Sequence, residues 1–164
     1  MTGRDRRLLS YGLSAAIVVA LTFAVVLAVF GSAGSTVAST QDSPARQAVQ
    51  RVASAFAANV NTYSSSDIAG YTQRVRPLLS DEFERSFSRA IQGIVAQMRT
   101  AKIQSRGEVL VTGVSTLDQD SATVLVVCDA DVNTAVGSRA RHFRWEVDLI
   151  RRDGRWLVNG FEPQ

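Results

Sequence analysis

The chain begins with a long apolar stretch that lacks the polar stripe of a water-soluble helix. Residues 8–30 form 23 consecutive positions without a charged side chain, and no charge follows until Asp42. A helix of that length spans about 34 Å, more than the roughly 30 Å of a bilayer's hydrocarbon core. Because a helix satisfies its own backbone hydrogen bonds in lipid, the pattern predicts one transmembrane helix over Leu8–Phe30.

The charges beside this stretch predict its orientation. Arg4, Arg6 and Arg7 lie just before it, whereas the first basic residue after it is Arg46. Positive residues remain on the cytoplasmic side of a membrane. We therefore expect residues 1–7 to form a cytoplasmic tail, the helix to lie in the inner (cytoplasmic) membrane, and the C-terminal part to be extracytoplasmic.

A cleaved signal peptide is the alternative explanation of the N-terminus. It would share the basic start, but its apolar core would have only about 7–15 residues and would end at a small-x-small cleavage site. Gly31-Ser32-Ala33 and Thr36-Val37-Ala38 are weak candidates for such a site. The length of the stretch favours a retained anchor. Residues 31–43, rich in Gly, Ser, Ala and Thr, then predict a flexible stalk before an exported domain over 44–164.

The exported part opens with the periodicity of an amphipathic helix. Pro44 suits the first helical turn, and Asp42 or Ser43 can cap it. The apolar positions that recur at helical spacing are Val49, Val52, Ala53, Phe56 and Val60. The polar, turn-rich stretch 61–66 predicts the end of this first helix.

Two further helices are predicted before residue 106. A short one covers about 67–76 and is broken by Pro77. A longer one begins after Ser80, which can cap it, and acidic residues follow in its first turn, where the helix dipole favours them. Its apolar stripe runs to Met98 through Phe83, Phe87, Ile91 and Ile94 or Val95.

After about residue 106 the period changes from 3.6 to 2, which indicates strands. Four are predicted, at Glu108–Thr116, Thr123–Val132, Arg141–Arg151 and Arg155–Phe161. In the third strand apolar residues alternate strictly with polar ones, as in a sheet that buries one face. Asp153-Gly154 is a hairpin signal. Helices followed by an antiparallel meander predict an α+β domain of about three helices on a four-stranded sheet.

Composition narrows the function classes. The net charge is +3, and the first seven residues contribute +2 of it. A nearly neutral domain argues against nucleic-acid binding, which needs a clustered basic face. Cys128 is the single cysteine, so an internal disulfide is excluded, and its position in a strand predicts a small buried hydrophobe.

The layout resembles the Mce-associated membrane proteins of actinobacteria, whose exported domain is related to the nuclear-transport-factor-2-like cone. Three segments carry the resemblance: Asp118-x-Asp120-x-Ala122-x-Val124-Leu125-Val126, the later Asp129-x-Asp131, and Trp145-x-Val147-x-Leu149 followed by Asp153-Gly154-x-Trp156-Leu157-Val158. By analogy with that superfamily, the sheet should curve around the first long helix and enclose a hollow. A periplasmic subunit of type IV secretion systems shares the topology.

The resemblance implies a function for the chain. Members of the family are accessory or stabilising subunits of Mce complexes, which import lipids through the cell envelope. It implies envelope membrane proteins, Mce transporter subunits above all, as partners, and it supplies no catalytic, cofactor-binding or metal residues. A lipid carrier that uses the hollow, and less favourably a small cone-fold enzyme, are the alternatives. Self-association stays open.

The polar residues give little support for metal or acid–base chemistry. His142 is the single histidine and shares a strand face with Arg144, Glu146 and Asp148, so it is expected to be a solvated surface residue. The aspartates at 118, 120, 129 and 131 form two pairs that a strand separates, whereas a calcium loop needs its oxygen ligands close together. They are expected to be turn and strand-end charges.

An enzyme of this fold would need a carboxyl or phenol group in an apolar pocket. The side chains that could point inward are those of Tyr63, Tyr71, Asp129 and Asp148, but no reacting pair is evident among them, so we expect no enzyme. The aromatic residues Phe143, Trp145, Trp156 and Phe161 are expected to lie in the core rather than to line a lipid site. The arginine clusters 139-141-144 and 151-152-155 are expected to be solvated faces, with contact to anionic headgroups as the alternative.

Overall fold

The computed structural model describes residues 43–164. The predicted cytoplasmic tail (1–7), the transmembrane helix (8–30) and all but the last residue of the stalk (31–43) lie outside the described residues. Within residues 43–164, no helix is long and apolar enough to cross a bilayer. The described residues form a hydrophobic core of their own.

The three helices predicted after residue 43 are confirmed. Helix α3 covers Pro44–Val60, α4 covers Ile68–Val75, and α5 covers Asp81–Thr100. A single 3₁₀ turn, η1, covers Arg76–Leu78 and contains the predicted breaker Pro77. It follows α4 directly, because proline cannot donate the backbone hydrogen bond that would continue an α-helix. Ser80 caps α5 as expected, accepting a hydrogen bond from the Phe83 backbone N–H.

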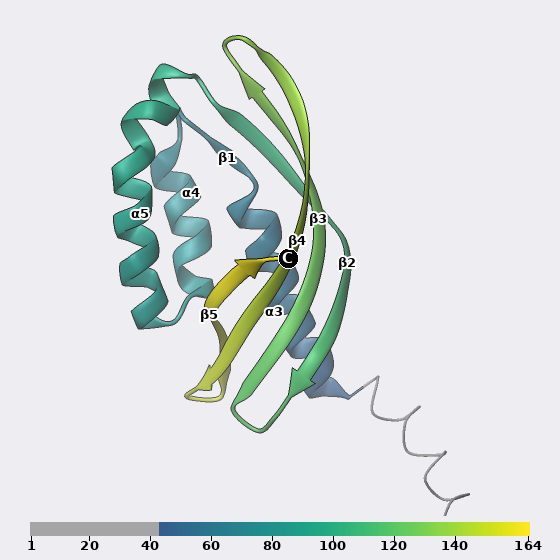
Figure 1. The fold of residues 1–164 in the computed structure, drawn as a ribbon. Coiled ribbons are helices and arrows are strands. Elements are labelled where there is room, and N and C mark those ends of the chain that lie inside the picture. The colour runs from purple at the N-terminus through teal and green to yellow at the C-terminus, as the bar shows by residue number, and fades with distance from the viewer. Residues whose placement is uncertain (1–42) are drawn as a thin grey trace, which may run out of the picture. The chain divides into compact units, whose positions relative to one another are not determined.

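The sheet has five strands, not the four predicted. In chain order they are β1 (Tyr63–Ser64), β2 (Gln104–Leu117), β3 (Ser121–Thr134), β4 (Gly137–Arg152) and β5 (Arg155–Pro163). Each pairs with the next in an antiparallel ladder, and the sheet curls around α3 (Figure 1). Strand β1 was missed because it has only two residues, which is too short to show an alternating pattern.

Strands β3 and β4 extend past their predicted ends to form a long hairpin. The prediction stopped at Val132 and resumed at Arg141, whereas the two strands pair as far as Thr134 and Gly137. Figure 1 shows the tip of this hairpin projecting beyond the sheet's helix-covered part. Both faces of β4 are exposed there, so the sequence carries no alternation, and Val136 at the tip is 96% exposed.

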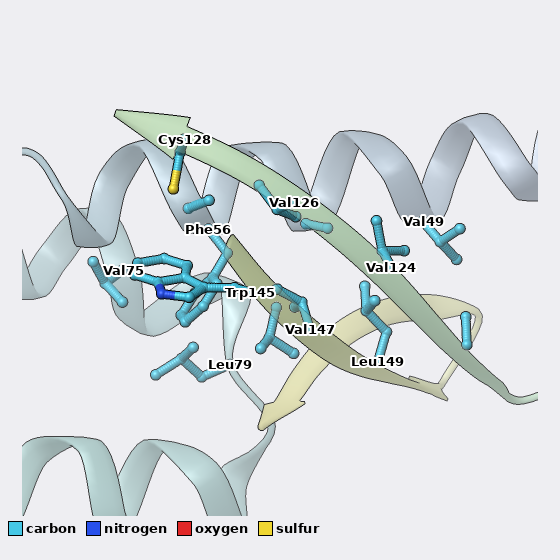
Figure 2. Packing of buried hydrophobic residues seen from close by; sticks show 14 of the residues in the cluster. Val49, Phe56, Val75, Leu79, Val124, Val126, Cys128, Trp145, Val147 and Leu149 are labelled. Atoms are coloured by element: carbon cyan, nitrogen blue, oxygen red, sulfur yellow. The ribbon is translucent and has the colours of Figure 1, made fainter. Parts of the chain in front are cut away.

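The concave face of the sheet packs on α3 and forms the core (Figure 2). Phe56 of α3 is fully buried, and its ring lies 5.4 Å from the Phe161 ring, 6.2 Å from Phe83 and 6.4 Å from Trp145, measured between centroids. The strand residues buried on this face include Val124, Val126, Cys128, Val147 and Leu149. Side chains therefore fill the centre of the cone.

Beyond its short pairing with β1, the edge of β2 is covered by polar side chains from α3 and from Thr62, two residues after the end of α3. The Arg46 guanidinium donates to the carbonyl of Val114, and the Gln50 amide donates to that of Thr112. Farther along, the Thr62 hydroxyl accepts from the backbone N–H of Gly107. These bonds satisfy polar groups of an edge strand that no neighbouring strand reaches.

One end of the domain gathers the chain's entry point and two hairpin turns, and we call it the entry end. The start of α3 reaches the last residues of β2 through the bond from Arg46 to Val114. The β2–β3 turn lies beside the end of β4, since the Arg151 N–H donates to the Asp120 carbonyl. The β4–β5 turn at residues 153–154 and the start of α5 lie at the same end (Figure 1).

Candidate functional site

Among residues 43–164, the interior of the cone offers a buried phenol but no buried carboxylate. Tyr71 is 3% exposed, and its ring stands edge-on to that of Tyr63 with centroids 5.8 Å apart. Burial raises the pKa of the Tyr71 hydroxyl above its usual value, and the neighbouring Tyr63 adds to this while Arg74 opposes it. Tyr71 is therefore neutral at physiological pH.

The prediction that Asp129 and Asp148 could point into the hollow is wrong. Their strand neighbours Cys128 and Val147 are fully buried in the core, so strand alternation turns the two aspartates to the outer face. Asp148 accepts a hydrogen bond from the Thr123 hydroxyl there, at 3.0 Å. No carboxylate therefore joins Tyr71 to form an acid–base pair from the residues proposed.

Asp129 instead forms a pair with His142 on the outer face. The ring Nδ1 lies 2.8 Å from Oδ1 of Asp129, and the two side chains are 71% and 39% exposed. Glu108 stands on the other side of Asp129 in the register, which the sequence did not predict because the strands had to be aligned first. With Asp131 they border a shallow cavity of about 400 Å³. The described residues contain no group of three or more His, Cys, Asp or Glu side chains able to hold a metal ion.

The two other predicted aspartates lie far along the sheet from this pair. Asp118 and Asp120 belong to the β2–β3 turn, where the Ser121 hydroxyl donates to the Asp118 carboxylate. Strand β3 separates them from Asp129 and Asp131, as expected from the sequence. The four carboxylates are therefore not brought together.

Cys128 is buried, as predicted. Desolvation raises the pKa of its thiol, and a hydrogen bond from the Asn61 amide to Sγ, at 3.4 Å, partly opposes this. A raised pKa leaves little thiolate at neutral pH, so Cys128 has none of the activation of a reactive cysteine.

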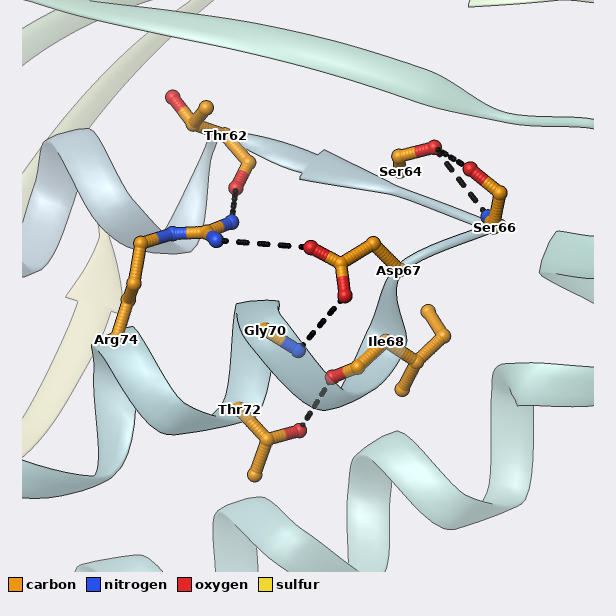
Figure 3. Close-up of polar contacts among 8 residues, drawn as sticks. All are labelled: Thr62, Ser64, Ser66, Asp67, Ile68, Gly70, Thr72 and Arg74. Carbon is orange, nitrogen blue, oxygen red and sulfur yellow. Dashed lines mark hydrogen bonds and ion pairs between the residues drawn. The ribbon is translucent and has the colours of Figure 1, made fainter.

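The corner between β1 and α4 is held by a polar network (Figure 3). Asp67 caps α4 by accepting from the Gly70 N–H at 2.9 Å, and it pairs loosely with Arg74 at 3.9 Å. Arg74 also donates to the carbonyl of Thr62, which ties α4 to the end of α3. Each polar group here has a structural partner, so the corner is a brace of the fold.

An apolar patch lies on the convex face of the sheet, opposite the helices. Its members are Leu110, Val111 and Leu125, which are 55%, 58% and 45% exposed. Val111 and Leu125 lie on the outer sides of β2 and β3, and a bulge between Val109 and Val111 exposes Leu110 as well. We call these three residues the outer apolar patch. The sequence did not reveal it, because the bulge shifts the alternation within β2.

A groove at the entry end lies between the β4–β5 hairpin and the first turn of α5. It has a volume of about 580 Å³, and Arg85, Arg152 and Arg155 lie around it. The predicted cluster 151-152-155 is thus divided. The guanidinium of Arg151 lies over the ring of Trp156, 6.0 Å from its centroid, whereas Arg152 and Arg155 line the groove. Arg85 could not be assigned from the sequence, since it comes from a distant helix.

The second predicted arginine cluster is not a cluster. Arg139 and Arg141 alternate with Arg144 along β4, so they project from opposite faces of the strand. Among the predicted aromatic residues, Trp145 is buried in the core and Phe143, Trp156 and Phe161 pack against it. The expectation that these rings serve packing rather than a lipid site is in line with this arrangement.

Comparison with known proteins identifies the fold. The sequence matches no protein-family model and no curated protein. A periplasmic fragment of TraM superposes with a TM-score of 0.62 at 12% identity, over 74% of this chain and 98% of that one. An IcmL-like type IV secretion system protein from Legionella pneumophila gives 0.61 at 10% identity, over 74% and 92%. CagV, a VirB8 homologue from Helicobacter pylori, gives 0.58 at 8% identity, over 72% and 97%. These likenesses show the fold alone: the expected arrangement of helices packed on a curved antiparallel sheet is confirmed, with five strands in place of four.

Proposed function

We propose that this chain is a non-catalytic accessory subunit, tethered to the inner membrane, that binds and stabilises an Mce-type lipid importer in the cell envelope. The outer apolar patch on a cone-shaped domain carries this proposal. Leu110 and Val111 are adjacent in β2, Leu125 lies diagonally across from Val111 in the register, and all three are about half exposed. Exposed apolar patches on a monomer mark surfaces that bind other proteins. The predicted anchor would hold the patch near its partners and raise their effective concentration.

The fold likeness supports an envelope role. The matched chains include a periplasmic fragment and a type IV secretion system protein, and the domain covers 92% or more of each. The finer assignment to Mce complexes comes from the sequence resemblance in the Asp118–Val126 and Trp145–Val158 segments.

The geometry of the interior favours a non-catalytic role over a carrier. In the centre of the cone, where an acyl chain would have to lie, the rings of Phe56 and Phe161 pack together, and the centroid of each lies within 6.4 Å of those of Phe83 and Trp145. The buried phenol of Tyr71 has none of the proposed carboxylates beside it. A lipid carrier would need these rings to separate.

Affinity purification of the full chain from native membranes tests the proposal. After mild chemical cross-linking and detergent extraction, the tagged chain is expected to recover the permease and substrate-binding subunits of an Mce-type importer. The double variant Val111→Glu and Leu125→Glu should lower this recovery about tenfold, because burying an unpaired charge at an interface costs more than the 1.4 kcal/mol of a tenfold loss.

The control is Val136→Glu, which places one such glutamate on an exposed valine at the tip of the β3–β4 hairpin. It should leave recovery unchanged. The proposal would be abandoned if the wild-type chain eluted alone, if it recovered secretion-system components instead, or if the patch variant and the control behaved alike.

A further inference from the structure

Two arginines face each other at the end of the β4–β5 ladder without a structural counter-ion. Arg152 and Arg155 form the last residue pair of that ladder. Like charges placed directly opposite in an antiparallel pair destabilise a sheet. Within residues 43–164, no carboxylate oxygen lies within 4.0 Å of either guanidinium. Their hydrogen bonds are long ones, at 3.5 Å, to the carbonyls of Arg151 and Pro77. The pair is thus available to an anionic group.

The groove beside this pair is amphipathic and carries both signs of charge. Ile150 and Leu157, which oppose each other in the ladder, contribute apolar lining. Its basic lining residues are Arg85, Arg152 and Arg155, and its acidic lining residues are Asp81, Glu82 and Asp153. Three cations and three anions give a net charge of zero. A ligand that carries both a phosphate and an ammonium group is therefore matched better than a bare anion.

The position of the groove favours a membrane lipid as the source of such a ligand. It lies at the entry end, where residue 43 leads into α3 (Figure 1). A connection of thirteen Gly- and Ser-rich residues, as the sequence predicts for 31–43, spans about 20 Å on average. The groove would then lie within reach of lipid headgroups. This step rests on the membrane anchor of the proposed function.

We propose that this groove binds the headgroup of an amine-bearing phospholipid such as phosphatidylethanolamine. The phosphate binds between Arg152 and Arg155, whose guanidinium groups donate charge-assisted hydrogen bonds to its oxygens. The ammonium group faces Asp81 and Glu82 in the first turn of α5. The contact fixes the domain against the bilayer surface instead of leaving it free on its connection.

Tryptophan quenching in lipid nanodiscs tests this contact. The chain has two tryptophans, and Trp145→Phe leaves Trp156, beside the hairpin, as the single reporter. The full chain is reconstituted in discs with a fixed fraction of shallow-brominated phosphatidylcholine, and the remaining lipid is phosphatidylcholine, phosphatidylethanolamine or phosphatidylglycerol. Phosphatidylethanolamine is expected to increase the quenching of Trp156 about twofold over the other two, since only it supplies both phosphate and a hydrogen-bonding ammonium.

Two charge-reversal variants locate the effect. Arg152→Glu with Arg155→Glu should abolish the increase. Arg139→Glu with Arg141→Glu makes the same charge change at the other end of β4 and should preserve the increase. Far-UV circular dichroism confirms that each variant is folded.

Three results would overturn the headgroup contact. Equal quenching in all three lipids would show a contact without headgroup recognition, and the strongest quenching in phosphatidylglycerol would show simple attraction of arginines to anionic lipid. A chain that fails to co-purify with the discs would remove the anchor itself. Because a single purified protein is used, failure to bind importer subunits leaves this result unaffected, so the two proposals fail separately.

Discussion

Gly107 of β2 lies so close to the end of α3 that adding a single methyl group there should destabilise the fold. A Cβ atom at this position would stand 2.4 Å from Cβ of Asn61, and 3.2 and 3.3 Å from its carbonyl carbon and Cα. Backbone atoms cannot turn away as the end of a flexible side chain can. Gly107→Ala must therefore shift α3 or β2, and overpacking of this kind costs about 1–3 kcal/mol.

Gly113, six residues along the same strand, provides the matched control. A Cβ there meets no atom within 4 Å. Gly113→Ala should therefore raise the free energy of unfolding by about 0.5 kcal/mol, because alanine restricts the unfolded chain. Gly107→Ala restricts the unfolded chain equally, but the clash in the folded state outweighs this effect. We expect the two variants to differ by about 2 kcal/mol, or about 8 °C in Tm for a domain of this size.

Urea unfolding of residues 43–164, which form the core described above, measures both free energies of unfolding. A double-mutant cycle adds Asn61→Gly, which removes the opposing Cβ together with the hydrogen bond to Cys128 Sγ. The cost of Gly107→Ala should fall by about 1 kcal/mol or more in that background. Equal stability of the two alanine variants, or a coupling energy near zero, would refute the reasoning.

Four more outcomes follow from the packing and the caps. Phe56→Ala removes a fully buried ring and should cost about 3–5 kcal/mol in urea unfolding; a cost below about 1 kcal/mol would mean that the cone is hollow. Asp67→Ala removes the acceptor of the Gly70 N–H and should cost about 1 kcal/mol, most of it recovered by Asp67→Asn, which can still cap α4. Because burial raises the pKa of Tyr71 in the folded state, its stabilising effect is complete below pH 10 and is lost as the pH rises further; Tyr71→Phe should flatten this alkaline loss in pH-dependent melts. Cys128 should react with a thiol reagent only as fast as the domain opens, and immediate reaction without denaturant would contradict its burial.

The elements that repeat over many residues could be predicted from the sequence. In β4 the alternation correctly placed Trp145, Val147 and Leu149 in the core, because one face of that strand is buried over its central length. Helix α5 continues through Gly93, as its apolar period predicted. Gly93 has open space around it, so it lowers the stability of the helix only through its poor helix propensity. The two-residue β1 was missed since its pairing with Ser105 and Gln104 is a long-range contact.

The candidate surfaces depend on register and on contacts between distant segments, which a single sequence does not give. The outer apolar patch exists because a bulge exposes Leu110 together with Val111. The turn that sets Arg152 opposite Arg155 was predicted from Asp153-Gly154, and both turn residues have the positive φ that such a turn requires. The other wall of that groove comes from α5, about seventy residues earlier, and only folding brings it there.

The polar cover along β2 limits how this domain can meet another protein. Side chains of Arg46, Gln50 and Thr62 already occupy backbone groups that an incoming peptide strand would need. At the opposite border of the sheet, Val158 is bridged by Leu79, and its carbonyl accepts the Ser80 N–H. At these covered positions an added strand is disfavoured, whereas residues 137–143 of β4 pair with β3 on one side only. Along the covered part of β2, strand addition is blocked, and the same polar cover protects that edge against edge-to-edge polymerisation.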